Sequence, residues 1–287
     1  MNAFCKSLPC LLLAAGFMLP ASARAHDAHA EPAARPSAAP PPRPANWSQA
    51  PLIAPVGGRP EPGAALVAAS GIATAELTVL SPDQPGQPRS VQAEGGRWRV
   101  TPDAPGKGGY YLLQLRSTAD AEVRTAMTAW NFQGKAAAPT RTLVAIRPGL
   151  EILPQVLPEH GGMREGEAHR FAVRFDGRPL PGAVVQLETQ PGSRSRVVAG
   201  PDGVATVVFP RDFDPAQFDP KAGMGRARQA FVLSVSHQAG AMRHESAFNF
   251  FYYPDLMRER DQMAGYAVLV AGMLLATPLL RHRKEQS

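Results

Sequence analysis

The sequence predicts an all-β protein of two immunoglobulin-like β-sandwich domains, preceded by a signal peptide and followed by a single transmembrane helix. Three observations lead to this prediction. Short runs of strand-forming residues recur between Gly, Pro and Asp clusters from about residue 50 to 254. An apolar stretch lies near each end of the chain, and no long helical period interrupts the strands between them. About 205 residues of such strands suit two domains of ordinary size.

The first 25 residues have the layout of a secretory signal peptide. Lys6 lies in a short polar start, Leu11–Leu19 is apolar, and small residues precede a cleavage point after Ala25. We therefore expect export. Cys5 and Cys10 both lie inside this segment, so the mature chain would contain no disulfide, no thiolate metal ligand and no cysteine nucleophile.

The last part of the chain predicts a membrane anchor. Residues 264–280 form an uncharged, apolar run at the short limit for crossing a hydrocarbon core about 30 Å thick. Arg281, Arg283 and Lys284 follow it directly, which favours a cytoplasmic tail over 281–287 and a periplasmic body. We expect a single-pass protein of the cell inner membrane; an amphipathic or buried helix is the alternative interpretation of this run.

The net charge argues against a nucleic-acid partner. Lys6 and Arg24 leave with the signal peptide, so 28 of the 30 basic residues remain against 24 acidic ones. Part of that small excess belongs to the C-terminal tail, and no basic block occurs in the body of the chain. A surface of this kind has no electrostatic footprint for phosphate backbones.

The strand-like runs fall into two groups with a boundary at Pro148-Gly149. Asp176-Gly177 offers the pair of positive φ angles that a tight hairpin turn needs. The first group contains AELTVLSP, RWRVTP, GGYYLLQLRS, AEVRTAMTAWNF and RTLVAIRP (141–148), and the second contains LEILPQ, HRFAVRFDG, AVVQLETQ, RSRVVAGPDG, VATVVFP, QAFVLSVSHQ and ESAFNFFYYP.

These signals together predict seven parts of the chain. Residues 30–46 are nearly all Pro, Ala and Arg, which favours an extended, semi-rigid spacer that cannot bury a core. The predicted parts are a signal peptide (1–25), a His-bearing Pro-rich arm (26–49), sandwich domain 1 (50–147), sandwich domain 2 (148–254), a juxtamembrane linker (255–263), a transmembrane helix (264–280) and a cytoplasmic tail (281–287).

No motif of an enzyme stands out. The sequence lacks a Gly-x-Ser-x-Gly elbow, a Ser-x-x-Lys signature and a His-Glu-x-x-His pair. The glycines of PGKGGYY lack the Walker spacing and precede a strand instead of a helix. We therefore expect a protein that is not an enzyme.

The predicted new N-terminus is a candidate metal site. Cleavage after Ala25 would leave His26 with a free amine beside its imidazole, and His29 follows three residues later. An amine and a ring nitrogen chelate a metal ion together, but this pair alone is an incomplete site. The alternative is that the two histidines are what the cleavage left behind on a disordered tail.

His237 and His244 form a second candidate pair. A two-residue turn at Ala239-Gly240 would pair Val235 with His244 and His237 with Met242, so that the two imidazoles become diagonal neighbours on one face. Imidazole suits nickel, copper, cobalt and zinc, and a nearby thioether favours copper. In the alternative interpretation the two histidines cover the edge of the core; His169, at the start of a strand, is interpreted as structural.

Residues 148–210 resemble a family of exported proteins. The segments GLEILPQVLP, GEAHRFAVRFDGRPLPGAVVQL and PDGVATVVFP are similar to a domain-of-unknown-function family associated with nickel and cobalt uptake, and 50–147 matches more loosely. Its members commonly begin, after the signal, with a histidine and a small residue, as His26-Asp27 does. The resemblance implies an accessory role beside a metal-uptake permease in the membrane.

From these observations we expect a membrane-anchored periplasmic protein that binds a divalent transition metal, nickel or cobalt, or delivers it to an uptake transporter. Its metal ligands would be His26, His29, His237 and His244, with copper as a further candidate ion. Its partner would be a membrane transporter subunit. The alternative function is a structural or adhesive β-sandwich module that binds a protein partner without metal.

Overall fold

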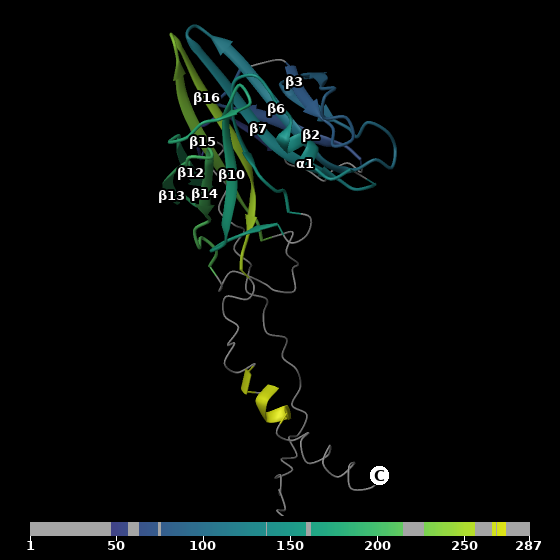
Figure 1. Cartoon of the computed structure of the whole chain (residues 1–287). Helices are drawn as coiled ribbons and strands as arrows, with labels where there is room; N and C mark the ends of the chain where they lie inside the picture. The colour runs from purple at the N-terminus through teal and green to yellow at the C-terminus, as the bar shows by residue number, and fades with distance from the viewer. Residues whose placement is uncertain are drawn as a thin grey trace, which may run out of the picture. The chain divides into compact units, whose positions relative to one another are not determined.

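The computed structural model describes residues 47–56, 63–73, 76–135, 137–158, 162–214, 227–255, 266–267 and 269–273 (Figure 1). The predicted signal peptide, the His-bearing arm up to residue 46 and most of the predicted transmembrane run lie outside these residues. Short helical pieces are described at 266–267 and 269–273. Within the described part of the chain, no helix has the length and apolarity that a membrane crossing requires.

The described body is built almost entirely from β-strands. Its first half contains β1 (Leu52–Pro55), β2 (Ala65–Ser70), β3 (Glu76–Leu80), β4 (Arg89–Gln92), β5 (Arg97–Val100), β6 (Gly109–Ala119), β7 (Glu122–Phe132) and the short helix α1 (Thr140–Val144). Its second half contains β8 (Leu150–Pro154), β9 (Met163–Arg164), β10 (Ala168–Phe175), β11 (Arg178–Pro179), β12 (Val184–Thr189), β13 (Arg194–Val198), β14 (Val204–Val208), β15 (Gln229–Ala239) and β16 (Met242–Tyr253).

The same strand order occurs twice. In the first half, the sheet β1-β2-β5 faces the strands β4-β3-β6-β7; in the second half, β8-β10-β14 faces β13-β12-β15-β16. The hairpins β6–β7 and β15–β16 correspond, and β6 and β15 bury almost the same sequence of positions. The predicted sandwich architecture of an all-β protein is thereby confirmed.

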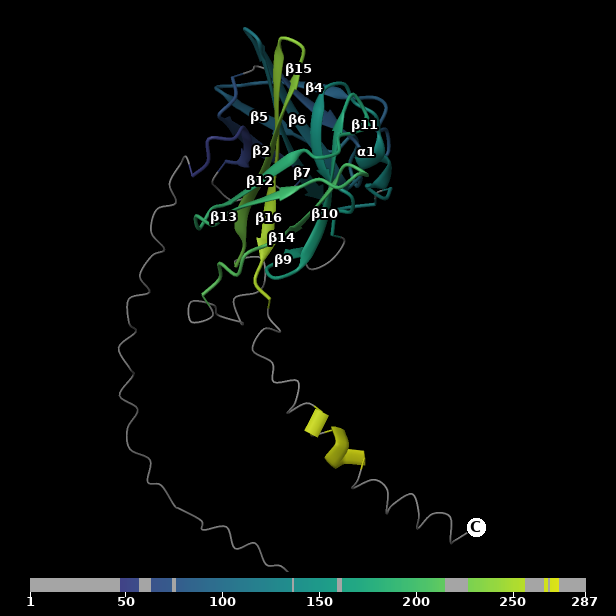
Figure 2. The same cartoon turned by 60° about the vertical axis from the view of Figure 1, so that its left-hand side comes forward.

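The two halves are joined by a parallel pairing of β7 with β16. The register runs from Glu122 opposite Arg243 to Thr128 opposite Asn249. Figures 1 and 2 show the two long hairpins side by side as parts of one sheet. The domain boundary at Pro148-Gly149 stays a prediction. Strands from both sides of this boundary belong to one continuous sheet of nine strands.

The covering sheets lie on opposite faces of this shared sheet. Successive residues of a strand point to opposite faces, and β7 uses both. Ala126 and Phe132 of β7 pack in the first core with Val67 and Trp98 from β2 and β5. Met127 packs in the second core with residues of β8 and β10.

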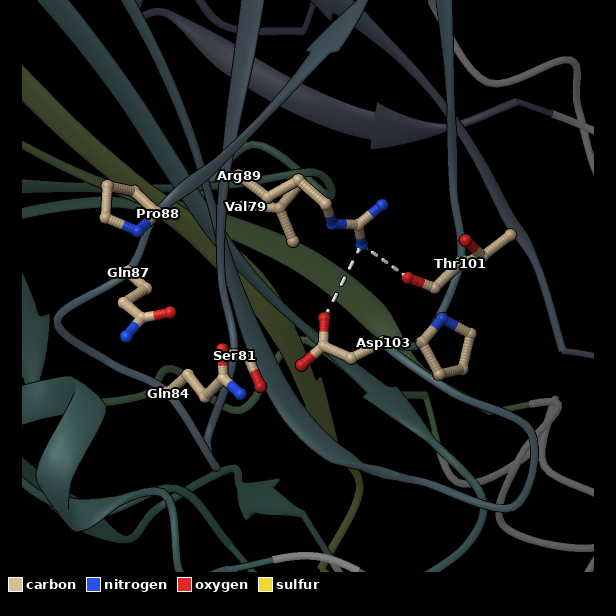
Figure 3. Close-up of a pocket in the computed structure, with 9 residues that line it drawn as sticks. Val79, Ser81, Gln84, Gln87, Pro88, Arg89, Thr101 and Asp103 are labelled. Carbon is tan, nitrogen blue, oxygen red and sulfur yellow. Dashed lines mark hydrogen bonds and ion pairs between the residues drawn. The ribbon is translucent and has the colours of Figure 1, made fainter.

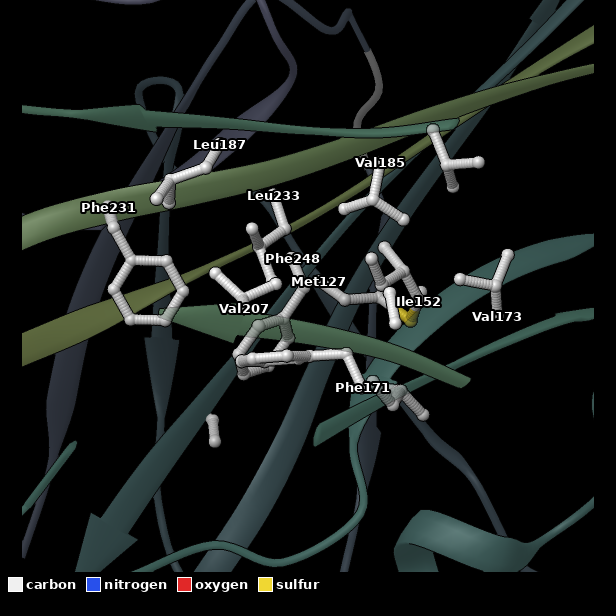
Figure 4. Packing of buried hydrophobic residues seen from close by; sticks show 14 of the residues in the cluster. Met127, Ile152, Phe171, Val173, Val185, Leu187, Val207, Phe231, Leu233 and Phe248 are labelled. Carbon is white, nitrogen blue, oxygen red and sulfur yellow. The ribbon is translucent and has the colours of Figure 1, made fainter. Parts of the chain in front are cut away.

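The second core contains the larger cluster of buried aromatic rings. Phe171, Phe231 and Phe248 are fully buried and contact one another with ring centroids about 6.3–6.4 Å apart. Figure 4 shows Met127, a residue of the first half, lying among these second-half side chains beside Ile152. Since burying one such side chain contributes about 1.5–3 kcal/mol, the halves stabilise each other through this core.

Residues 141–148, predicted as a strand, instead contain helix α1, so that prediction is wrong. The reason is tertiary. Arg147 donates through Nη1 to the Thr142 carbonyl at 2.7 Å, and Arg174 donates through Nη2 to the Leu143 carbonyl at 2.6 Å. Together these guanidinium groups satisfy carbonyls that a helix C-terminus leaves unpaired, which outweighs the strand preference of Thr and Val.

Glu151 holds these two arginines together. Its Oε2 lies 2.7 Å from Nε of Arg147 and its Oε1 lies 2.7 Å from Nε of Arg174. The glutamate is 2% exposed. A buried carboxylate between two guanidinium groups therefore fixes α1 against β8 and β10.

Five short strands were missed by the sequence pattern, whereas one turn was predicted correctly. β1, β2 and β4 contain Ala, Pro or Ser and little alternation of large apolar residues, and β9 and β11 are only two residues long. The turn at Asp176-Gly177 is confirmed, because Asp176 has φ 50°, Gly177 has φ 76°, and Phe175 pairs with Arg178.

The side-chain amide of Asn249 ties the first strand to the shared sheet. Its Oδ1 accepts from the Ile53 amide at 3.0 Å, and its Nδ2 donates to the Ile53 carbonyl at 2.8 Å. Both residues are buried. One amide thus replaces a neighbouring strand for both backbone groups of Ile53.

The first prediction concerns the buried ion cluster. Glu151→Gln should lower the free energy of unfolding by about 3–5 kcal/mol, because it leaves two buried guanidinium charges uncompensated. Urea denaturation measures this change. Asp202→Asn, which removes the partner of Arg170 in an exposed pair at 3.3 Å, is the matched control and should cost less than about 1 kcal/mol. Equal effects of the two substitutions would show that the buried cluster is not stabilising.

The second prediction concerns Asn249. Asn249→Ala should destabilise the chain by about 2–5 kcal/mol, since two buried backbone groups lose their partners at about 1–3 kcal/mol each. Asn131→Ala, at an exposed position of β7, should leave stability nearly unchanged. The same denaturation experiment applies, and a cost no greater than that of the control would contradict the proposed role.

Candidate functional site

The structure places His237 and His244 directly opposite each other. Ala239 pairs with Met242, so the turn residues are Gly240 and Ala241. The predicted turn at Ala239-Gly240 is therefore wrong by one residue, and the predicted register, which set the two histidines diagonally, is wrong by two. The reason is conformational: Gly240 has φ 59°, and it occupies the first central position, where one type of hairpin turn requires glycine.

This register brings the two imidazoles together on one face of the sheet. Directly opposed residues have Cβ atoms roughly 4.5–5.5 Å apart. Phe175, at the end of β10, packs against both rings, with centroid distances of 4.8 Å to His237 and 5.0 Å to His244. Both histidines are half-buried. The phenyl ring thus holds the imidazole pair from the covering sheet.

Charged groups from both halves act on this pair. Burial lowers the pKa of His244 below 6.5; Arg116 and His237 lower this pKa further, and Asp176 opposes them. Nδ1 of His244 is buried and has no hydrogen-bond partner. These effects favour the neutral form of His244, which is the protonation state that binds a metal ion.

The segment between the halves positions both charges. Arg116 of β6 donates through Nη1 to the Pro148 carbonyl at 3.2 Å, and the Gly149 amide donates to Oδ1 of Asp176 at 2.6 Å. Gly149 has φ 88°, a conformation that other residues rarely adopt, and a Cβ there would lie 3.4 Å from the Arg116 guanidinium. The chain crossing at residues 148–149 therefore sets the surroundings of the histidine pair.

The described residues bring together two of the four predicted ligands. His26 and His29 lie outside the described part of the chain. Among the residues that the structure places, no group of three or more His, Cys, Asp or Glu side chains is close enough to hold a metal ion. The histidine pair would therefore need further ligands from the arm or from a partner.

Phe175 and Arg116 are site residues that the sequence analysis missed. Phe175 follows Phe171 and Val173 at alternate positions of its strand, which places it on the core face directly before the predicted turn. That periodicity was available in the sequence. Arg116 gave no comparable signal, because its position near His244 depends on the pairing of β7 with β16.

His169 has a structural position, as interpreted from the sequence. Its ring packs against Phe209 with centroids 5.4 Å apart, and burial lowers its pKa below 6.5 while Glu167 raises it. It lies on β10, outside the pair formed by His237 and His244.

A second polar cluster surrounds Asp212 in the second half. Thr189 and Tyr252 donate to its Oδ2 at 2.6 and 2.7 Å, and Ser193 donates to its Oδ1 at 2.5 Å. Burial, followed by the bond to Asp212, raises the pKa of the Tyr252 hydroxyl. The hydroxyls thus act as donors to a single carboxylate, and the cluster holds the chain near Phe213 against the sheet.

Comparisons with known proteins leave the family open. No protein-family model matches the chain, and no curated protein matches it. Among solved structures, the chain is similar to a bacterial ice-binding adhesin, with 12% sequence identity and a TM-score of 0.24; the match covers 67% of this chain and 57% of that chain. Drosophila N-cadherin EC1-3 also matches at 12% identity, with a TM-score of 0.19, over 72% of this chain and 67% of that one. Scores this low carry no argument about function.

The third prediction concerns the titration of His244. In metal-free buffer, its midpoint should lie below 6.5, and Arg116→Gln should raise it because a nearby positive charge is removed. Asp176→Asn should lower it further, and asparagine tolerates the positive φ at this position. The ring-proton NMR signals of His244 report the midpoint.

The sign of the stability effect follows from the direction of the pKa shift. As the pH is lowered through 6.5, His244 becomes protonated in the unfolded chain before it does in the folded chain. The free energy of unfolding therefore decreases as the pH decreases, and it levels off below the pKa of the folded state. Arg170→Gln is the control and should leave the midpoint in place. A His244 midpoint that moves in neither site variant would contradict the electrostatic account.

Proposed function

We propose that this protein binds a divalent transition-metal ion, nickel or cobalt, with His237 and His244 as two of its ligands. The observation that carries the proposal is the register of β15 and β16, which sets the two imidazoles opposite each other beneath Phe175. The lowered pKa of His244 supports it, since metal binding requires a neutral imidazole.

Two imidazoles alone form a weak site, so the proposal includes further ligands. The amine and ring of His26, together with His29, would come from the arm, or a transporter subunit would supply the remaining positions. A site of nitrogen ligands without thiolate binds moderately, which suits transfer of the ion to a membrane transporter. Met242 neighbours His244 on the same strand face, and its thioether keeps copper as a further candidate ion.

The cellular setting of the proposal comes from the sequence. The predicted signal peptide and the apolar run at 264–280 support an exported protein anchored in the inner membrane with a periplasmic body. The twice-repeated strand order supports immunoglobulin-like domains as the scaffold. Together these features favour an accessory protein beside an uptake transporter.

The fourth prediction tests metal binding. The purified mature chain should bind about one equivalent of Ni²⁺ or Co²⁺ in isothermal titration calorimetry, and His237→Ala or His244→Ala should weaken binding by about tenfold or more, because each removes one coordinate bond. His169→Ala is the matched control, since it removes a half-buried imidazole outside the pair. One extra residue before His26 tests the arm, because it removes the amine chelate and keeps both rings. Binding that ignores all of these changes would contradict the proposed ligands.

A protein-binding module is the second candidate function. It is favoured by one face of the strands β12, β15 and β16, opposite to the face that the sheet β8-β10-β14 covers. Gln186, Ser236 and Arg243 are exposed on this face. A pocket of about 240 Å³ lies there between Arg124 and Glu188. The absence of any binding at micromolar metal in the titration above would favour this function over the first.

A further inference from the structure

The first half of the body contains a pocket of about 610 Å³ that is separate from the histidine pair. It lies between the segment connecting β3 to β4 and the segment that follows β5 (Figure 3). Its volume falls in the range of small-molecule sites, roughly 300–1,000 Å³. The lining residues are Val79, Ser81, Gln84, Gln87, Pro88, Arg89, Thr101, Pro102 and Asp103.

Arg89 is the central charged group of this pocket. Its Nη2 donates to the Thr101 carbonyl at 2.6 Å and lies 3.9 Å from Oδ1 of Asp103, too far for a direct hydrogen bond. Its Nε is buried and has no acceptor in the described residues. Because Nε is closed to solvent, a ligand in the pocket contacts the exposed part of the Arg89 side chain, which is 40% accessible.

Asp103 provides acceptors next to this donor. Its amide donates to the Tyr111 hydroxyl at 3.1 Å, which fixes the backbone that carries the carboxylate. The side chain of Asp103 is 33% exposed and that of Arg89 is 40% exposed. The pair therefore offers a guanidinium and a carboxylate side by side, both within reach of a ligand.

The rest of the lining is polar and uncharged, with two proline rings. In Figure 3 the side chains of Gln84 and Gln87 lie across the pocket from Arg89 and Asp103. Each amide both donates and accepts hydrogen bonds. Pro88 and Pro102 also line the pocket and add apolar ring surface.

The segment between β3 and β4 is held in place before any ligand arrives. Asp83 pairs with Lys107 at 2.7 Å and accepts from the Ala137 amide at 3.2 Å. The Gln87 amide donates to the Gln84 carbonyl at 3.1 Å, which closes a turn between the two glutamines. A preformed pocket loses little conformational freedom on binding.

From this chemistry we propose that the pocket binds a neutral carbohydrate. One sugar hydroxyl accepts from the exposed part of the Arg89 guanidinium while its neighbour donates to the carboxylate of Asp103, and the amides of Gln84 and Gln87 bind hydroxyls on the other side. Hydroxyl groups meet both requirements because each one donates and accepts. The C–H faces of the sugar ring contact Pro88 and Pro102.

The charge balance of the lining selects against other ligands. The carboxylate of Asp103 repels an anionic ligand, and the guanidinium of Arg89 repels a cationic one. An apolar ligand would remove water from both charged groups without replacing the lost hydrogen bonds. A neutral molecule with many hydroxyls can pair with each of these groups, because every hydroxyl both donates and accepts.

Saturation-transfer NMR on the purified full chain tests this proposal, with maltose, cellobiose and trehalose as probes and EDTA present to exclude any metal effect. At least one of the three sugars should receive saturation from the protein. Arg89→Gln and Asp103→Asn should each weaken its binding about tenfold or more, as expected where a site loses a polar partner. Asp103→Asn keeps the shape of the side chain, so it tests the carboxylate even where Arg89→Gln lowers stability.

The exposed pair Arg170 and Asp202 supplies matched controls. Arg170→Gln and Asp202→Asn make the same chemical changes in the second half and should leave sugar binding unchanged. Transfer to none of the three sugars overturns the proposal. So does binding that persists in both pocket variants, and so does a clear preference for glucuronate or glucosamine over the neutral sugars.

Discussion

The parallel pairing of β7 with β16 is the constraint on which the rest of the structure depends. It turns two four-stranded layers into one sheet, and it forces the covering sheets onto opposite faces because alternate residues of β7 serve different cores. Met127 and Ala126 are neighbours in sequence yet belong to different cores. The first half therefore contributes directly to the packing of the second, and a short linker is not their only connection.

The surroundings of the histidine pair follow from that pairing. β16 lies between β15, which carries His237, and β7, whose other neighbour β6 carries Arg116. A guanidinium of the first half thus lowers the pKa of a histidine in the second. Phe175 and Asp176 reach the same place from the covering sheet, so groups from two layers surround His244 and shift its pKa.

Local chemistry was predictable from the sequence, and long-range placement was not. Alternation revealed most strands, and Asp176-Gly177 revealed its own turn, because both signals act within a few residues. Helix α1 was missed because Arg147, Arg174 and Glu151 stabilise it through tertiary contacts. The predicted register of the two histidines was wrong by two positions because either neighbour of Gly240 could form the turn with it. The pairing of β7 with β16 could not be predicted, because neither strand has a sequence pattern that identifies its partner.

The repeated strand order gives the described body an approximate internal symmetry. A rotation by half a turn about an axis along β7 and β16 exchanges these two strands and keeps them parallel. The same rotation exchanges the two faces of the sheet and superposes the strand order of one half on that of the other. Two identical subunits paired through their last strands would have this symmetry. The chain therefore has the arrangement of two subunits of a symmetric dimer joined end to end, in which each half keeps a covering sheet and a core of its own.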